Sequence, residues 1–339
     1  MLAIVDDKIP YIEGEIEQLV DEVRYLPGSA ITSADVKDAD ILIVRTRTHC
    51  DRSLLEGSSV RLVVTATIGF DHLDTIYLDA SGIRWTNCPG CNASSVRQYV
   101  HNSLLSTGYL RPGLTAGVVG VGHVGTLVAA DLVAVGMHVL RCDPPKHEPA
   151  TMEEIAALAD IITFHTPLTR EGDCPTWHLA DSRFFHSLQR KPLIVNSSRG
   201  SVVDNAALVQ ALDEGLVADA IIDTWEGEPA INLALLERAV IATPHIAGYS
   251  ADGKANATRM SLQAVCQFIG RSFELNIHPP QLPANFAYGE STEGPLRLYD
   301  PRVDSALLKN NPEKFEYFRG HYPLRREGFF KSEKLKVKS

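Results

Sequence analysis

The stretch Gly117-Val-Val-Gly120-Val-Gly122-His-Val-Gly125 decides the fold of this chain. Its glycines at 120, 122 and 125 have the spacing G-x-G-x-x-G, between an apolar run typical of a strand and an apolar stretch, 127–135, typical of a helix. In this setting Gly120 permits a tight turn, Gly122 lets the backbone approach a pyrophosphate, and Gly125 lets the helix pack on the strand. The stretch therefore predicts a dinucleotide-binding unit.

A carboxylate at the end of the next predicted strand indicates which dinucleotide binds. Asp143 follows the strand 137–142 and lies 18 residues after Gly125. It can accept both ribose hydroxyls of NAD and would repel the 2′-phosphate of NADP. Arg141 lies two residues earlier, and strand alternation does not decide whether its side chain reaches the pocket. We expect NAD, with the loop residues His123 and Val124 beside it.

Short apolar runs alternate with helix-length amphipathic stretches through most of the chain. Runs at 2–5, 41–44 and 62–65 predict buried strands of a first α/β unit over residues 1–92, with a helix at 12–20. After a helix at 94–106, six more strands are predicted at 116–121, 137–142, 161–164, 193–196, 220–223 and 240–242. The alternation predicts two Rossmann-like, doubly wound parallel sheets with helices on both faces.

We assign three regions to these elements. Residues 1–92, completed by a helix at 256–275, form the expected substrate domain. Residues 93–255 form the expected NAD-binding Rossmann domain, and the active site is expected in the cleft between the two. Residues 276–339 form a C-terminal extension with many aromatic side chains at 312–330. Such a surface predicts either docking onto a second subunit or a hairpin packed on its own domain.

Composition excludes several classes of protein. The net charge of −10 argues against nucleic-acid binding, which needs a clustered basic face. No run approaches 18 apolar residues, and the N-terminus resembles a strand more than a signal peptide, so we expect no membrane span and a cytoplasmic location. Cys88-Pro-Gly-Cys91 has redox or zinc half-site spacing, but no second pair follows, so it predicts a turn with incidental thiols. We expect no metal site.

Three further segments follow predicted strands and supply reactive side chains to one sheet edge. They carry Arg199, the acidic pair Glu226 and Glu228, and His245. Oxidation of a 2-hydroxy acid removes a hydride from C2 and a proton from its hydroxyl oxygen. A histidine can take that proton near neutral pH, a carboxylate can orient the imidazole, and an arginine can hold the substrate carboxylate. The set therefore suits a hydroxy-acid dehydrogenase.

Together these motifs resemble the D-isomer-specific 2-hydroxy-acid dehydrogenases over about residues 1–270. The resemblance implies a catalytic triad of Arg199, Glu228 and His245. Glu228 is preferred because the family's carboxylate directly precedes a proline, here Pro229, and Glu226 stays the alternative. The resemblance also implies further NAD contacts, from Thr166, Ser197, Ser198, Arg199, Asp223 and Gly248.

Longer strings resemble one subfamily, among them Asp223-Thr-Trp-Glu-Gly-Glu-Pro229 and His245-Ile-Ala-Gly-Tyr-Ser250. Its members oxidise 4-phospho-D-erythronate to 2-oxo-3-hydroxy-4-phosphobutanoate in pyridoxal 5′-phosphate biosynthesis. The resemblance implies substrate contacts from Arg45, Thr46, Thr67 and Tyr249, and a homodimer through a shortened C-terminal region. Arg47 either meets the 4-phosphate or faces solvent.

Two other functions stay open on the sequence. A related dehydrogenase could act on glycerate or phosphoglycerate, and the distinguishing feature would be a site for a distal phosphate. A non-catalytic NAD-binding sensor could also use this fold. The intact set of Arg199, Glu228 and His245 argues against the sensor, because a binding module needs no proton relay.

Overall fold

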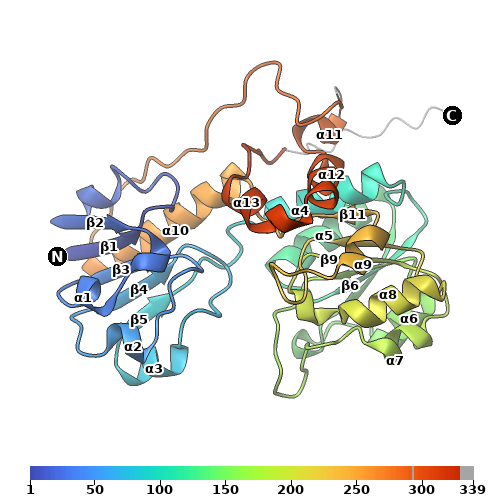
Figure 1. Cartoon of the computed structure of the whole chain (residues 1–339), viewed down its shortest axis with the longest axis horizontal. Helices are drawn as coiled ribbons and strands as arrows, with labels where there is room; N and C mark the ends of the chain where they lie inside the picture. Colours follow the sequence, from blue (N-terminus) through green and yellow to red (C-terminus); the bar gives the residue numbers. More distant parts are fainter. Residues whose placement is uncertain (292–293, 329–339) are drawn as a thin grey trace. The chain divides into compact units, whose positions relative to one another are not determined.

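The computed structural model describes residues 1–291 and 294–328 and divides them into two compact units. The first unit holds Met1–Asn92 and Ala251–Gln281. The second holds Ala93–Ser250 and the described residues from Leu282 onward. Each unit contains one parallel sheet with helices packed around it (Figure 1). The predicted fold class of two doubly wound α/β units is confirmed. Within the described residues, no helix is both long and apolar enough to cross a membrane.

The sheet of the first unit has the order β2-β1-β3-β4-β5. Its strands are β1 (Leu2–Asp6), β2 (Glu22–Leu26), β3 (Ile41–Val44), β4 (Leu62–Thr65) and β5 (Arg84–Thr86). The three central strands are buried along their whole length, as expected where helices cover both faces. The chain runs from β1 to β2 and then returns to the other side of β1. This reversal makes a switch point at the carboxyl ends of β1 and β3, where open α/β sheets bind ligands.

The helices of the first unit are α1 (Ser33–Val36), α2 (Arg52–Leu55), α3 (Thr75–Ala80) and α10 (Ala251–Ile269). The predicted helix at 12–20 is wrong, because the structure has only a 3-10 turn there, Ile16–Gln18. Gly14 interrupts the stretch in the left-handed region, with φ of +86°. The long helix α10 begins at Ala251, earlier than the predicted residue 256, and its apolar face joins the core of this sheet.

The sheet of the second unit has the order β11-β10-β9-β8-β6-β7. Its strands are β6 (Thr115–Val119), β7 (His138–Cys142), β8 (Ile161–Phe164), β9 (Leu193–Asn196), β10 (Asp219–Ile222) and β11 (Ile241–Ala242). Successive residues of one strand enter different cores: Ile161 packs into the core on one face and Ile162 into the core on the other. The switch point of this sheet lies between β6 and β8.

The helices that cover the second sheet are α4 (Ala93–Ser106), α5 (His123–Val135), α6 (Met152–Leu158), α7 (Ser182–Ser187), α8 (Asn205–Asp213) and α9 (Leu233–Arg238). Of these, α4 precedes the first strand of the sheet, and α5 to α9 lie between successive strands in the chain. Helix α4 confirms the helix predicted at 94–106. Several begin at side-chain caps: the Asp204 carboxylate, for example, accepts hydrogen bonds from two backbone N–H groups of α8.

The C-terminal segment, residues 294–328, packs on the second unit of the same chain. Its helices are α11 (Gly294–Leu298), α12 (Pro301–Asn310) and α13 (Phe315–Gly320). Ser305 accepts a hydrogen bond at 3.0 Å from the backbone N–H of Ala242, on the edge strand β11, and Leu308 and Phe315 enter the core. Of the two predicted alternatives for the aromatic stretch, the structure therefore shows packing within the chain, although Tyr317 stays 57% exposed. Phe329 and Phe330 lie outside the described residues.

A buried polar cluster fixes this segment. Arg325 is fully buried, with its guanidinium 3.6 Å from the centre of the Tyr299 ring. It donates hydrogen bonds to Gln98 and to the backbone carbonyls of Ser95 and Ile246. Beside it, Asp304 accepts hydrogen bonds from two tyrosine hydroxyls, those of Tyr288 and Tyr322. Burial raises the pKa of Asp304 to about 6, although these hydrogen bonds oppose the shift.

This carboxyl should make stability depend on pH. Its pKa is higher in the folded state, so its stabilising contribution is complete below the ordinary aspartate pKa and is lost as pH rises through about 6. Two pKa units correspond to about 3 kcal/mol. We expect Asp304→Asn to gain stability relative to the wild type as pH rises from 4 to 7. Thermal unfolding of both proteins across this range checks the prediction. A constant difference would contradict it.

Candidate active site

The glycine loop follows β6 as the sequence predicts. Gly120 has φ of +86°, and a Cβ on it would lie 2.8 Å from the His165 carbonyl. A Cβ on Gly125 would overlap the carbonyl oxygen of Gly120, so helix α5 can approach the loop only with glycine there. A Cβ on Gly122 would instead meet only the Lys146 ammonium, at 3.7 Å. Gly122 therefore faces open space at the N-terminus of α5, where a phosphate group can approach the backbone N–H groups.

Two buried hydroxyls at the neighbouring strand ends support a bound cofactor. The hydroxyl oxygens of Thr166, after β8, and Ser197, after β9, are buried and have no hydrogen-bond partner in the described part of the chain. Buried polar atoms of this kind normally find a partner, so a ligand with polar groups fits here. Ser198 is engaged within its own loop, where it donates to Asn196. Burial lowers the pKa of His165, next to Thr166, to about 3, so this imidazole is neutral near pH 7.

Asp143 lies where a cofactor ribose is expected. The contacts around it show whether the Arg141 side chain approaches this carboxylate. The Asp143 carboxylate accepts a hydrogen bond at 2.8 Å from the backbone N–H of Val121, in the glycine loop. Lys146 lies 3.3 Å from the same carboxylate oxygen. Arg141 instead pairs with Glu148 at 2.6 Å. The cation nearest to this carboxylate is therefore Lys146, which the sequence analysis did not single out.

Replacing Asp143 should change which cofactor is used. We expect Asp143→Ala to lower kcat/KM for NAD about 10-fold, because the ribose hydroxyls lose a charged acceptor. It should raise kcat/KM for NADP about 10-fold or more, because the repulsion is gone and Lys146 can meet the 2′-phosphate. Steady-state kinetics with both cofactors checks this. The double variant Asp143→Ala, Lys146→Met should lose the gain with NADP, and an equal gain in both variants would refute the role of Lys146.

The loop after β9 brings Arg199 against the loop after β10. A Cβ on Gly200 would overlap the backbone carbonyl of Trp225 and lie 2.6 Å from the backbone nitrogen of Glu226. Only glycine allows this approach. The Arg199 guanidinium donates at 2.9 Å to the carbonyl of Ser198, in its own loop. The sequence motif thus has a steric basis, since it lets the two loops that carry predicted site residues lie in backbone contact.

The two residues predicted as an acid–base pair, His245 and Glu228, lie in contact. Nδ1 of His245, after β11, lies 2.8 Å from one carboxylate oxygen of Glu228, and the other oxygen accepts a hydrogen bond from the backbone N–H of Trp225. Burial favours the neutral carboxyl, but the hydrogen bond and charge of His245 outweigh it, so the pKa of Glu228 is lowered. The His245 side chain is 32% exposed and can reach a ligand.

A buried aspartate holds the backbone of the histidine loop. Asp223 accepts hydrogen bonds from the Thr243 hydroxyl and from the backbone N–H groups of Ile246 and Ala247. His245 itself has φ of +54°, a strained conformation for a side chain of its size. Burial raises the pKa of Asp223, against the opposing charge of His245. In this structure Asp223 fixes the His245 loop, and Gly248 lies in the same loop.

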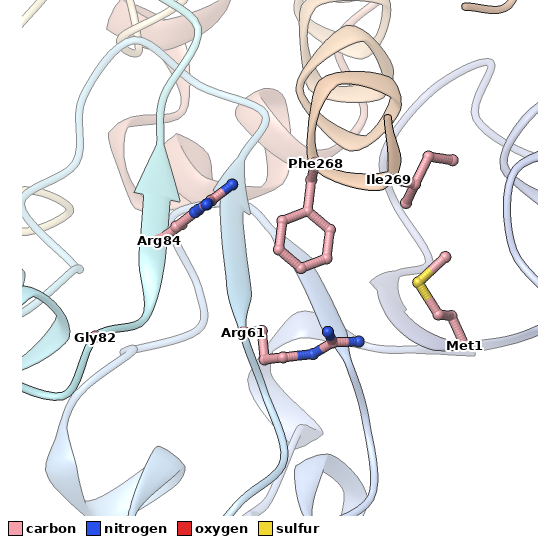
Figure 2. Close-up of a pocket in the computed structure, with 6 residues that line it drawn as sticks. All are labelled: Met1, Arg61, Gly82, Arg84, Phe268 and Ile269. Atoms are coloured by element: carbon pink, nitrogen blue, oxygen red, sulfur yellow. The ribbon is translucent and has the colours of Figure 1, made fainter. Parts of the chain in front are cut away.

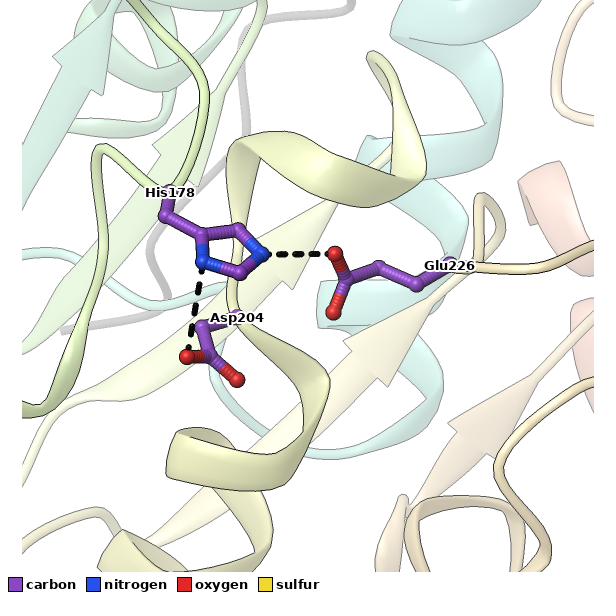
Figure 3. Close-up of side chains that lie close together, drawn as sticks. All are labelled: His178, Asp204 and Glu226. Atoms are coloured by element: carbon purple, nitrogen blue, oxygen red, sulfur yellow. Dashed lines mark hydrogen bonds and ion pairs between the residues drawn. The ribbon is translucent and has the colours of Figure 1, made fainter.

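The alternative carboxylate, Glu226, has another partner. Its side chain lies 2.7 Å from Nε2 of His178, whose Nδ1 lies 3.5 Å from Asp204 (Figure 3). Glu226 also accepts a hydrogen bond from the backbone N–H of Asn205. These three side chains could hold a metal ion, a grouping that the sequence spacing did not reveal. Glu228, and not Glu226, contacts His245.

The remaining predicted substrate residues lie in the first unit, except Tyr249. Arg45 follows β3 and pairs with Asp6, which ends β1, at 3.2 Å, so it lies at the switch point of this sheet. Thr46 is exposed, and Thr67 donates a hydrogen bond to the carbonyl of Gly69. The pKa of Lys254, on α10, is lowered by burial and then by the like charge of Arg45. Lys254 is a second residue that the sequence analysis missed.

Two other features of the first unit contain none of the predicted site residues. A pocket of about 530 Å³ has Met1, Arg61, Gly82, Arg84, Phe268 and Ile269 around it (Figure 2). Met1 and Arg61 directly precede β1 and β4, and Arg84 begins β5, so the pocket lies at the amino ends of these strands, whereas ligands of such sheets bind at the carboxyl ends. Cys88 and Cys91 are buried and are not joined by a disulfide, and burial raises the pKa of Cys88 to about 11, which suits an incidental thiol.

Comparison with known proteins identifies a family whose members are NAD-binding dehydrogenases, as the glycine loop predicts. Residues 93–247 match the model of the D-isomer specific 2-hydroxyacid dehydrogenase, NAD binding domain. Erythronate-4-phosphate dehydrogenase of Bacteroides thetaiotaomicron is 52% identical and covers 96% of this chain and 97% of its own. The chain belongs to the erythronate-4-phosphate dehydrogenase family. A Porphyromonas gingivalis member of the family is 40% identical over 96% of this chain and 94% of its own.

Solved structures outside this family share its fold. The D-lactate dehydrogenase of Aquifex aeolicus, complexed with NAD and lactic acid, has a TM-score of 0.65 at 23% identity, over 80% of this chain and 96% of its own. The D-mandelate dehydrogenase of Rhodotorula graminis has a TM-score of 0.69 at 20% identity, over 83% and 99%. As a member of the erythronate-4-phosphate dehydrogenase family, the protein is an NAD-dependent oxidoreductase.

Proposed function

We propose that the protein oxidises 4-phospho-D-erythronate to 2-oxo-3-hydroxy-4-phosphobutanoate, a step of pyridoxal 5′-phosphate biosynthesis. The observation that carries the proposal is the His245–Glu228 pair at 2.8 Å, at the carboxyl edge of a sheet with an NAD-binding glycine loop. Full-length relatives named for this activity, 52% identical to the chain, support the choice of substrate. The proposed catalytic residues are Arg199, Glu228 and His245.

We assign His245 as the base that takes the proton of the C2 hydroxyl. Because Nδ1 donates to Glu228, Nε2 is left to accept the proton from the C2 hydroxyl. Glu228 stabilises the resulting imidazolium and keeps the ring oriented. The Arg199 guanidinium binds the substrate carboxylate and polarises the developing carbonyl. Bound NAD would supply the acceptor for the hydride that leaves C2.

A phosphorylated substrate needs further positive charge, and we assign that charge to Arg45 and Lys254. Arg45 and Lys254 are close enough for their like charges to lower the pKa of the lysine. Arg45 already pairs with Asp6, so Lys254 adds a second cation at this switch point, and the two cations together suit a ligand with several negative charges. We assign Arg45, Thr46, Thr67 and Tyr249 to substrate contacts, with Lys254 added to the set.

A comparison of substrates tests the proposal. Nicotinamide absorbance is followed with 4-phospho-D-erythronate, D-glycerate, 3-phosphoglycerate and D-lactate, with and without 2-oxoglutarate to reoxidise cofactor that stays bound. We expect 4-phospho-D-erythronate to have the highest kcat/KM, by about 100-fold over D-lactate, because phosphate contacts are charge-assisted. Preference for another acid would refute the substrate. Binding of NAD without turnover of any acid would favour a sensor.

The proposal includes a homodimer in the cytoplasm. The exposed ring of Tyr317 supports the dimer, because exposed aromatic side chains are common at interfaces. Light scattering during gel filtration should give twice the chain mass of 37.1 kDa. A monomer at micromolar concentration would exclude a stable dimer. Cell fractionation tests the location.

A further inference from the structure

Arg319, on helix α13 of the C-terminal segment, lies beside the acid–base pair. Its Nη1 is 4.0 Å from Glu228, at the same carboxylate oxygen that contacts His245. The same nitrogen pairs with Glu316 at 2.9 Å, and the ring of Phe315 lies 5.9 Å from the guanidinium carbon. Four side chains of alternating charge therefore lie in succession: His245, Glu228, Arg319 and Glu316.

The positive charge of the Arg319 guanidinium is largely buried, so nearby anions must stabilise it. The Arg319 side chain is 21% exposed, and its Nε is buried with no hydrogen-bond partner in the described residues. Burying a cation is unfavourable unless opposite charges stabilise it. Burial opposes the charged form, but Tyr249, Glu228 and Glu316 outweigh it and raise the pKa of Arg319. The same attraction acts on Glu228 in return.

Other contacts of the segment reach the same loop. The ring of Tyr322 packs edge-on against Tyr249, with centroids 5.8 Å apart. Arg325 donates to the carbonyl of Ile246, and Ser250 donates to Glu327 at 2.6 Å. The residues after His245 are therefore held from the C-terminal segment at three points. The segment that carries Arg319 is thus packed against the loop that follows His245.

We infer that Arg319 is a positioning residue of the active site, whose guanidinium keeps Glu228 ionised and aligned with His245, so that the C-terminal segment completes the catalytic machinery of its own chain. The inference rests on the proposed role of His245 as the base. Arg319 acts through Glu228 and touches neither substrate nor cofactor in this account.

The charges around His245 fix the direction of the expected effect. The carboxylates of Glu228 and Asp223 interact with the charge of His245, and Tyr249, Glu228 and Glu316 interact with the charge of Arg319. Removing the positive charge of Arg319 should make His245 harder to deprotonate. Since oxidation needs the neutral imidazole, the acid limb of the rate profile should move to higher pH. For partly screened charges on either side of one carboxylate, the shift is about half to one pH unit.

The test compares variants by the pH profile of kcat/KM with 4-phospho-D-erythronate. Arg319→Met should shift the acid limb upward by about half a unit or more and lower the rate at neutral pH several-fold. Arg319→Lys keeps the charge and should shift it much less. Glu316→Gln should shift the acid limb to lower pH. Without the negative charge of Glu316 beside it, the positive charge of Arg319 acts more strongly on Glu228. Arg302→Met is the matched control on the same segment, since Arg302 is 52% exposed and pairs with Asp300.

A second measurement does not depend on the substrate. The His245 ring is titrated by NMR in the NAD-loaded protein with labelled histidine, and its signal is identified by its absence in a His245→Asn variant. The same upward shift is expected in Arg319→Met. An unmoved His245 titration in folded, NAD-binding Arg319→Met, or an equal shift with lysine, would overturn the inference. Lack of turnover by the wild type would refute the proposed substrate and leave this titration to decide on Arg319.

Discussion

Replacing His245 by asparagine is expected to lower kcat roughly 10³-fold while NAD binding stays within about twofold. The imidazole is the proposed acceptor of the hydroxyl proton, and asparagine cannot take it. Asparagine also tolerates the left-handed backbone at this position, where φ is +54°, so the loop should keep its conformation. Stopped-flow kinetics gives kcat, and fluorescence titration gives the dissociation constant of NAD.

The controls separate loss of chemistry from loss of structure. His186→Ala removes an exposed histidine on α7, far along the chain from the site, and should change neither quantity. Glu228→Gln should fall between wild type and His245→Asn, because the amide still orients the ring without stabilising the imidazolium. A His245→Asn variant that retained wild-type kcat would show that another group takes the proton.

The second large effect is expected from a single methyl group at Gly200. Its Cβ would overlap the backbone of Trp225, so the loop that carries Arg199 must move away from the loop that carries Glu228. Displacement of a catalytic group by about 1 Å commonly lowers the rate by about 100-fold. We expect Gly200→Ala to lower kcat/KM by about that factor and to lower the unfolding temperature by several degrees.

Gly320 provides the matched control for Gly200. It ends α13, and a Cβ on it would meet no atom within 4 Å. Gly320→Ala should therefore keep kcat/KM within about twofold. If Gly200→Ala were equally harmless, the backbone contact between the two loops would not be needed for catalysis.

Most of the fold follows from local sequence patterns, and the missed strands show where such patterns stop. The central strands are continuous apolar runs, because helices cover both faces. The strands β2 and β5 were missed, and both lie at the edges of the first sheet. In Glu22–Leu26, charged residues alternate with half-buried ones, and Arg84–Thr86 has only three residues. Edge strands of this kind carry no long apolar signal.

The residues of the candidate site also fall into those that local sequence predicts and those that it does not. The pairing of Glu228 with His245 could be predicted because each follows a strand, and the order of strands brings their ends together. Arg319 could not be predicted, since it is 91 residues from Glu228 in the chain and belongs to no motif. Lys254 was hidden for a similar reason, because a lysine on an amphipathic helix ordinarily faces solvent. Long-range charge pairs are fixed by tertiary packing and leave no local pattern.

The docking of the C-terminal segment has a consequence for synthesis of the protein. The last strand ends at Ala242, whereas Arg325 follows 83 residues later. At roughly 5–20 residues per second, a nascent chain spends several seconds with a finished Rossmann sheet and an unsupported His245 loop. Dinucleotide affinity should therefore arise on the ribosome before turnover does. Ribosome-arrested chains that stop before and after α13 would separate the two properties.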